Sequence, residues 1–220
     1  MITAIELALV DRLTRGLGQM VREVTTYSGE LDGDIGDIVR CLPAVWVTFG
    51  GITATRRYST SGKKRIVTGR FAIMVGEYNS RSEESARHGG VMQDEVGTNL
   101  LVESVRRLIT GQDLGLKIDY FEPGQVRTLF NTKTQDEAIS VYACEFDTRW
   151  TEVALENGRW PERSADPAHP DAAFNTYGGE LSDPDPDLLR IGMRYHQPGA
   201  NPATDPTDLV ELRKEENGED

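Results

Sequence analysis

Residues 43–76, PAVWVTFGGITATRRYSTSGKKRIVTGRFAIMVG, give the strongest strand signal in the chain. Three runs rich in β-branched and aromatic residues are separated by the glycine pair at 50–51 and by a Ser-Gly pair at 61–62 that suits a tight hairpin turn. The first run alternates Val45, Val47 and Phe49 on one side with Ala44, Trp46 and Thr48 on the other. The stretch predicts a three-stranded antiparallel meander with its middle strand at residues 53–59 and both faces substantially covered.

The middle of this stretch is strongly basic. No acidic residue lies between positions 50 and 76, whereas six cations lie between positions 56 and 70: Arg56, Arg57, Lys63, Lys64, Arg65 and Arg70. Two interpretations are open. The cations form a contact with a negatively charged surface, or they belong to a solvated turn at a sheet edge, where Lys and Arg discourage aggregation.

The charge of the chain is unevenly distributed. The net charge is −12 over 220 residues. Residues 1–155 contain 18 basic and 21 acidic residues, and residues 156–220 contain 6 basic and 15 acidic residues. Eight of the ten prolines also follow position 155. This change in composition predicts a folded domain at residues 1–156 and an acidic extension, rich in Pro, Gly and Asp, at residues 157–220.

The acidic balance disfavours a general nucleic-acid-binding protein, because neutralising phosphates requires an excess of Lys and Arg. No apolar run approaches the ~18 residues of a membrane span, and acidic residues interrupt the first apolar stretch. We therefore expect no membrane association, and a chain that stays in the compartment where it is synthesised. Cys41 and Cys144 are expected to be reduced thiols in or near the core.

Catalytic and metal-binding motifs are missing from the sequence. It has no P-loop, no nucleophile elbow, no dinucleotide fingerprint and no paired Cys or His ligands. The acidic loop at residues 27–37 has calcium-like spacing, but Pro43 occupies the twelfth position, where an EF-hand has Glu. His88, His169 and His196 are far apart in sequence. We expect a protein that is not an enzyme and that has no catalytic residue, cofactor or metal.

Two further segments have helical periodicity. Residues 3–6, Thr-Ala-Ile-Glu, match a capping box, and apolar residues recur at helical spacing from there to Val24. Residues 80–83, Ser-Arg-Ser-Glu, repeat the capping box before a second helix that is expected to stop at Gly111. The apolar stripe of this second helix is Met92, Val96, Leu100, Leu101, Val105, Leu108 and Ile109.

Strand patterns return after the second helix. Residues 116–120 fit a short strand, and residues 126–133 and 139–153 fit a long hairpin expected to join the first sheet. The predicted fold is therefore α+β: an antiparallel or mixed sheet of about five strands flanked by two long helices, followed by an irregular C-terminal extension. That extension has short apolar islets at residues 174–177, 188–195 and 209–212, so it is either largely disordered or ordered by docking on its own domain or on another subunit.

Four blocks of this sequence resemble a known phage family. They are MITAIELALVDRL at the start, CLPAVWVTFGG with the basic hairpin after it, RFAIMVGEYNSRSEESARHGG before the second helix, and SVYACEFDTRWTEVAL at the end of the hairpin. Together, over about residues 1–155, they are similar to the Mu-like phage gp-thirty-seven family, which is regarded as the tail terminator of contractile-tailed phages and prophages. The extension is not part of this resemblance.

The resemblance implies a structural virion protein with a tail-terminator-like fold. Such proteins form a hexameric ring at the head-proximal end of the tail tube, stop tube polymerisation and provide the surface for the head connector. The implied partners are further copies of this chain, the tail tube, the sheath and the connector, with DNA passing through the lumen without specific binding. The implied location is the virion tail, assembled in the cytoplasm of the bacterial host.

Two alternatives to a tail terminator stay open. The nearest is another head-tail joining or completion protein. The second, from a different class, is a small-ligand-binding α+β protein or enzyme. Within the ring hypothesis, the six cations of the hairpin are the candidate interface residues.

Overall fold

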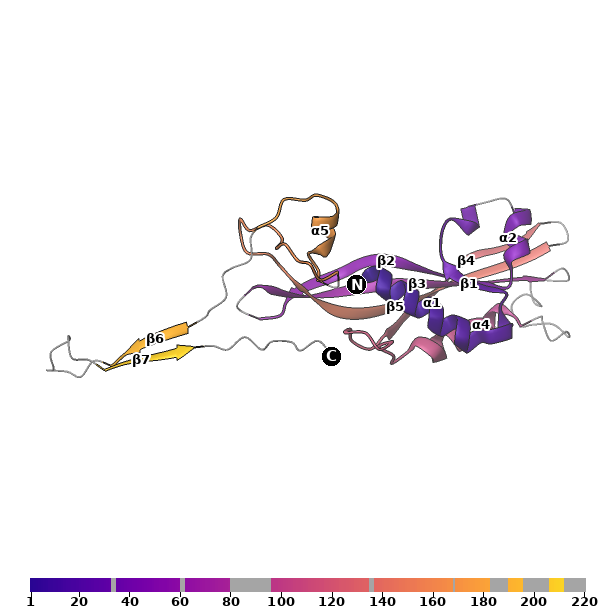
Figure 1. Cartoon of the computed structure of the whole chain (residues 1–220). Helices are drawn as coiled ribbons and strands as arrows, with labels where there is room; N and C mark the ends of the chain where they lie inside the picture. The colour runs from indigo at the N-terminus through magenta and orange to yellow at the C-terminus, as the bar shows by residue number, and fades with distance from the viewer. Residues whose placement is uncertain are drawn as a thin grey trace, which may run out of the picture. The chain divides into compact units, whose positions relative to one another are not determined.

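One mixed sheet is the framework of the computed structural model, which describes residues 1–32, 35–59, 62–79, 96–134, 137–167, 169–182, 190–195 and 206–211. Its strands are β1 (Glu23–Thr26), β2 (Ala44–Arg57), β3 (Lys64–Asn79), β4 (Glu122–Thr134) and β5 (Glu137–Val153). They lie in the order β1-β2-β3-β5-β4, with β1 parallel to β2 and every other pair antiparallel (Figure 1). The prediction of an α+β fold with a mixed sheet is confirmed, and so is the long β4–β5 hairpin.

The predicted meander is wrong in one respect, because residues 44–57 form a single strand. Gly50 and Gly51 make an irregularity in β2 instead of a turn: the pairing with β3 shifts between Phe49 and Gly51, and again between Ile52 and Ala54. Gly51 has a φ of 106°, a conformation that Gly adopts readily. The strand continues after each shift, so β2 and β3 make one long hairpin whose strands end at Arg57 and start again at Lys64.

Two helices cover one face of the sheet, α1 (Ile2–Leu17) and α4 (Thr98–Ile109). Apolar residues of both helices pack against alternate residues of β2, β3 and β5 in the larger core. At Gly16 an added Cβ would lie 2.6 Å from Leu108 Cδ2, so this glycine lets the side chain of α4 approach α1 closely. The larger core contains Ile5, Leu9, Leu13, Leu101, Val105, Ile109, Val45, Val47, Phe71, Ile73, Phe121 and Phe146.

The ends of α1 differ from the prediction. The helix begins at Ile2, so Thr3 lies inside its first turn and no side chain caps it. The Glu6 carboxylate instead accepts a hydrogen bond from the Phe49 amide of β2, with an N···O distance of 2.8 Å. After Leu17 the chain forms a short 3-10 turn and then β1, so Val24 belongs to a strand although its spacing fits the helical stripe.

The second predicted helix is only partly described. Residues 80–95, including the predicted capping box, Met92 and His88, lie outside the described residues. α4 starts after Gly97 and ends at Ile109, with Gly111 at a φ of 75° just beyond it, close to the predicted stop. Leu100 was expected in the buried stripe but is 48% exposed, because the neighbouring Leu101 faces the sheet. Residues 116–120 form a loop and not a short strand.

The opposite face of the sheet is covered at one end by α2 (Ile35–Cys41), which follows the 3-10 turn η2 (Glu30–Asp32). Figure 1 shows α2 on the other side of the sheet from α1 and α4. The prediction of a solvated loop over residues 27–37 is therefore wrong in part. The second core consists of Leu31, Ile38, Leu42, Ala44, Trp46, Met74, Val141 and Ala143. Its strand residues alternate with those of the larger core, which confirms that both faces are covered.

The chain divides into two compact units, Met1–Ala154 and Leu155–Asp220. The second unit contains α5 (Ala172–Thr176) and a two-stranded antiparallel sheet of β6 (Arg190–Arg194) and β7 (Thr207–Glu211). These three elements fall on the apolar islets of the sequence. Every described residue of β6 and most of the described residues of β7 are exposed.

Both cysteines are free, and Cys144 is buried in the larger core. Burial raises the pKa of the Cys144 thiol to about 11. The unfolded chain loses this proton near the ordinary thiol pKa, whereas the folded chain holds it, so the free energy of unfolding should fall as pH rises between these two values. We expect a loss of up to about 2 kcal/mol between pH 8 and pH 11.

Urea unfolding at several pH values measures this loss. The Cys144→Ala variant is the control, because it keeps every other titrating group and should have a shallower dependence on pH. Parallel curves for the two proteins would contradict the assignment. Alkylation at pH 8 should also modify the half-buried Cys41 well before Cys144, since the thiolate is the reactive form.

Candidate assembly interface

The distal half of the β2–β3 hairpin, residues 51–70, forms a feature that we call the basic arm. The Tyr58 amide donates to the Lys64 carbonyl at 3.0 Å, and the Gly62 amide donates to the Ser59 carbonyl at 3.3 Å, next to the turn. β5 runs alongside as a third strand: Val153 is opposite Lys64, and the Ala154 amide donates to the Lys63 carbonyl at 2.8 Å. Three hydrogen-bonded strands therefore support the arm up to its turn.

Five of the six predicted interface cations lie at the end of the basic arm. Arg56, Arg57, Lys63 and Lys64 are exposed, and Arg65 is half-buried. Over the described residues, Arg56, Arg57, Lys64 and Arg65 form no ion pair. Arg57 and Arg65 are also direct cross-strand partners, so two like charges face each other. Like charges directly opposite each other destabilise a sheet, and Glu152 of β5 is the cross-strand partner of Arg65 on its other side.

Arg70, the sixth predicted cation, has partners within its own unit. Its Nε and Nη2 donate to the two carboxylate oxygens of Asp147 at 2.8 and 2.9 Å, and its Nη1 donates to Glu145 at 2.8 Å. Arg127 approaches the other oxygen of Glu145 at 2.6 Å. The hydrogen bond with Asp147 is the largest cause of a raised Arg70 pKa. Arg70 thus ties β3 to β5 on the sheet face that α2 leaves open, and it is distinct from the cations at the end of the arm.

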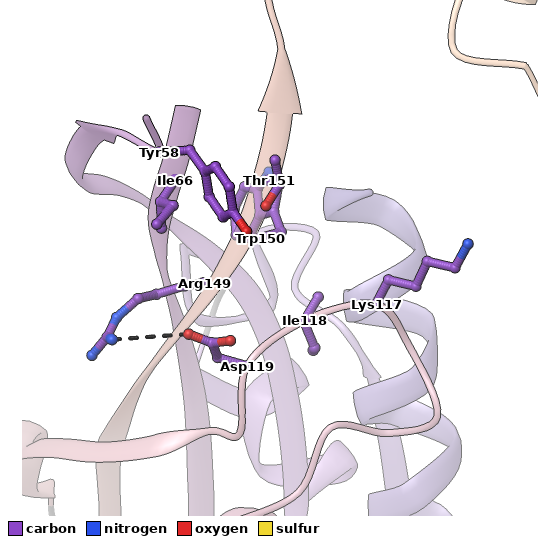
Figure 2. Close-up of a pocket in the computed structure, with 8 residues that line it drawn as sticks. All are labelled: Tyr58, Ile66, Lys117, Ile118, Asp119, Arg149, Trp150 and Thr151. Carbon is purple, nitrogen blue, oxygen red and sulfur yellow. Dashed lines mark ion pairs between the residues drawn. The ribbon is translucent and has the colours of Figure 1, made fainter. Parts of the chain in front are cut away.

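A groove of about 250 Å³ lies on the same face as Arg56, between the basic arm and the loop before β4. It is lined by Tyr58, Ile66, Lys117, Ile118, Asp119, Arg149, Trp150 and Thr151 (Figure 2). The Asp119 amide donates to the Arg149 carbonyl at 2.8 Å, which holds the loop against the outer edge of β5. Arg149 Nη1 lies 3.8 Å from Asp119 Oδ2, as Figure 2 shows. The groove is partly apolar and has charged side chains around it.

Sequence reasoning did not find this groove. Its lining comes from positions 58–66, 117–119 and 149–151, which only the pairing of β3 with β5 and the loop contact bring together. Tyr58 was visible within the predicted hairpin, but nothing in the local pattern placed Ile118 or Arg149 beside it. A second groove of about 360 Å³ shares Ile66, Asp119 and Arg149 and continues along the same face.

The described residues contain no group of three or more His, Cys, Asp or Glu that could hold a metal ion. His169 lies in the second unit, and His196, like His88, is outside the described residues. None of the described helices is long and apolar enough to cross a membrane.

Comparison with known proteins finds a family match for the first unit. No curated protein matches the chain. The model of the family described as Bacteriophage Mu, Gp37 matches residues 1–151, about two thirds of the chain and nearly all of the first unit. The match includes the basic arm and excludes the acidic extension, and it confirms the resemblance found in the sequence. It also supports a role as a phage structural protein. The chain belongs to the Bacteriophage Mu, Gp37 family.

Proposed function

We propose that this protein is a tail terminator. It forms a ring at the head-proximal end of the phage tail tube, stops polymerisation of the tube and joins the tail to the head connector. The supporting observation is the basic arm, a three-stranded projection on which Arg56, Arg57, Lys64 and Arg65 form no ion pair among the described residues, on a chain with a net charge of −12. Family membership supports the broader role of a phage structural protein.

A ring requires two different surface patches that meet between neighbouring copies, because a heterologous contact closes into a cycle. A basic arm on an acidic chain supplies such a complementary pair. Charge complementarity of this kind mainly fixes the orientation of partners and their rate of encounter. We propose six copies in the ring, with the tail tube, the sheath and the head connector as further partners, and DNA passing through the lumen without specific binding. No catalysis is required for this role.

Deleting the gene from the phage tests the proposal. Without a terminator, tube polymerisation has no stop, so particles should have tails of uncontrolled length, and these tails should lack heads. The tail-length distribution from electron micrographs measures this effect, and supplying the full chain from a plasmid should restore it. Images of the purified protein with tail tubes should show a ring at one end of each tube.

Two outcomes would contradict the tail-terminator proposal. Tails of normal length without heads would assign the chain to another step of head-tail joining. Normal tails with heads attached would remove it from this part of assembly altogether.

A further inference from the structure

The five-stranded sheet has two long edges that no described strand covers. On one side, β1 pairs with β2 only as far as Val47, so β2 has no strand beside it from Gly50 to Arg57 among the described residues. Between these two parts, the Glu6 carboxylate holds the Phe49 amide at 2.8 Å. On the other side, β4 is the last strand of the sheet and pairs with β5 alone. Open edges of this length are templates for a further strand.

The backbone of β2 directs hydrogen-bonding groups away from the sheet along its open edge. In an antiparallel pair, the backbone groups of successive residues point alternately toward the partner strand and away from it. The Tyr58 amide donates to the Lys64 carbonyl of β3, and the register from Ala54 to Arg57 has no shift. The backbone groups of Thr55 and Arg57 therefore point outward, and both residues are exposed.

The edge of β4 offers the same groups. The Ala154 amide donates to the Lys63 carbonyl on the β3 side of β5, so the even-numbered residues of β5 direct their backbone groups toward β3. Val126 is opposite Cys144, and Thr128 is opposite Tyr142. Val126 and Thr128 therefore point their backbone groups away from β5, and both are exposed. Each edge thus presents two outward residues at a spacing of two.

Strand direction makes the two edges complementary. The pairs β2–β3, β3–β5 and β5–β4 are all antiparallel, so β2 and β4 run in opposite directions. When a second copy lies beside the first with its strands in the same sense, its β4 is antiparallel to β2 of the first copy. Pairing two different edges in this way is a heterologous contact, which closes into a ring. Pairing β2 with β2 of another copy would be isologous and would stop at two chains.

Charge agrees with this direction. Antiparallel pairing puts the basic end of β2, at Arg57, beside the start of β4, where Asp119 and Glu122 lie. The side chains of these two acids are 64% and 68% exposed, and both carboxylates share one cation, Arg149. Arg127 of β4 is bound to a carboxylate of β5. The start of β4 therefore has one carboxylate charge left for a partner, and opposite charges fix the orientation of two surfaces.

We infer that the open edge of β2 in one copy pairs with the edge of β4 in the next copy, so that one sheet continues around the ring. Gly51 and Glu122 lie on the same row of a single sheet, so neighbouring copies are offset along their strands. Closing a sheet into a ring requires such a stagger, because its strands tilt. This inference rests on the proposed ring and goes further by naming the two edges that meet.

Thiol cross-linking between two differently labelled copies tests the contact. Both copies carry Cys41→Ser, which leaves only the buried Cys144 as a native thiol. An isotopically labelled copy carries Thr55→Cys, and an unlabelled copy carries Val126→Cys. After the two copies are mixed with tail tubes, they are treated with a bis-maleimide that spans roughly 8 Å, the distance between diagonal cross-strand neighbours. The control replaces Val126→Cys with Thr14→Cys, an exposed position on α1.

Mass spectrometry should find linked pairs of one labelled and one unlabelled chain. Their yield should exceed the control by roughly tenfold or more, because strand pairing holds the two thiols at a high effective concentration. Yields equal to the control would overturn the inference. Efficient linking of Thr55→Cys chains to one another would overturn it too, because it would show an isologous pair of β2 edges.

A proline at position 55 tests the backbone contact itself. Thr55→Pro removes an outward amide and no hydrogen bond to β3, and proline is accepted on edge strands, so urea unfolding of the purified chain should change little. The contact between copies should weaken by roughly tenfold or more, because a carbonyl of the neighbour loses its donor. Thr55→Val keeps the amide and is the matched control. Ring formation on tail tubes that is equal for the two folded variants would contradict strand pairing at this edge.

These results are separable from the test of the proposed function. Uncontrolled tail lengths after gene deletion, together with control-level cross-linking, would keep the terminator and remove this contact. Normal tails after gene deletion, together with a labelled-unlabelled pair formed by the purified proteins without tubes, would keep the contact and remove the terminator.

Discussion

Replacing Trp46 with Ala should lower the free energy of unfolding of the first unit by about 3–5 kcal/mol, the usual range for deleting a buried Trp side chain. Trp46 is fully buried in the second core, between β2 and α2. Gly76, the cross-strand partner of Ala44, has no side chain, and an added Cβ there would lie 3.1 Å from the Trp46 ring.

The free energy of unfolding that Trp46→Ala loses comes from side-chain packing. Trp46 Nε1 is buried and has no hydrogen-bond partner among the described residues, so the substitution removes no hydrogen bond. Thermal unfolding should show a midpoint lower by about 10 °C or more for a unit of this size. Trp160→Ala is the matched control, because Trp160 is 51% exposed and lies in the second unit. A small change for Trp46→Ala, similar to that for Trp160→Ala, would mean that the second core contributes little to stability.

Trp46 also shows how far the sequence predicts the fold. Alternation in residues 44–49 predicted that both faces of β2 are covered, and the two cores confirm it. The pattern could not say what covers the second face. α2 is only seven residues long and follows a polar segment, so it has no helical stripe of its own to recognise. Local periodicity finds buried positions, whereas their partners depend on tertiary packing.

The errors at the first helix have a similar cause. Val24 fits the spacing of the α1 stripe, but four residues of β1 gain hydrogen bonds from β2 over Ala44–Val47, a contact that no local pattern contains. Glu6 fits a capping box, but its carboxylate instead accepts a hydrogen bond from the amide of Phe49, 43 positions away. In both cases a long-range hydrogen bond replaces the local one that the motif predicts.

The candidate interface could be predicted from the sequence only where its residues are close together along the chain. Residues 56–65 are contiguous, so a hairpin necessarily brings their cations together. Arg70 appeared in the sequence as one more cation of that group, yet Glu145 and Asp147 lie beside it through the β3–β5 pairing. The groove depends on the same pairing and on the loop before β4. Sequence therefore reveals the charge of the arm, and the structure separates the cations at its end from the one that holds the sheet.

Changing Arg57, Lys63, Lys64 and Arg65 together to Ser should block assembly and leave the fold intact. Arg57 and Arg65 repel each other across the strands, so the free energy of unfolding should be unchanged or slightly higher. An exposed charge pair is worth about 0.5 kcal/mol, so four lost pairs weaken one contact by roughly 2 kcal/mol, about thirtyfold in its equilibrium constant. A ring repeats this contact at every subunit boundary, which multiplies the effect.

Complementation of the gene deletion by this quadruple variant measures assembly, and urea unfolding measures stability. Two controls separate the arm from charge in general. Substituting Ser for the exposed Arg15, Arg22, Arg40 and Arg107 changes the net charge equally but should leave assembly intact. Arg70→Ser should instead lower stability, because it leaves Asp147 without its bidentate partner and removes one of the two cations that contact the buried Glu145. Salt should weaken assembly of the native chain much more than that of the quadruple variant, since screening acts on the charges that the variant lacks. Full head-joined tails from the quadruple variant at both low and physiological salt would instead show that the cations at the end of the arm form an ordinary solvated turn.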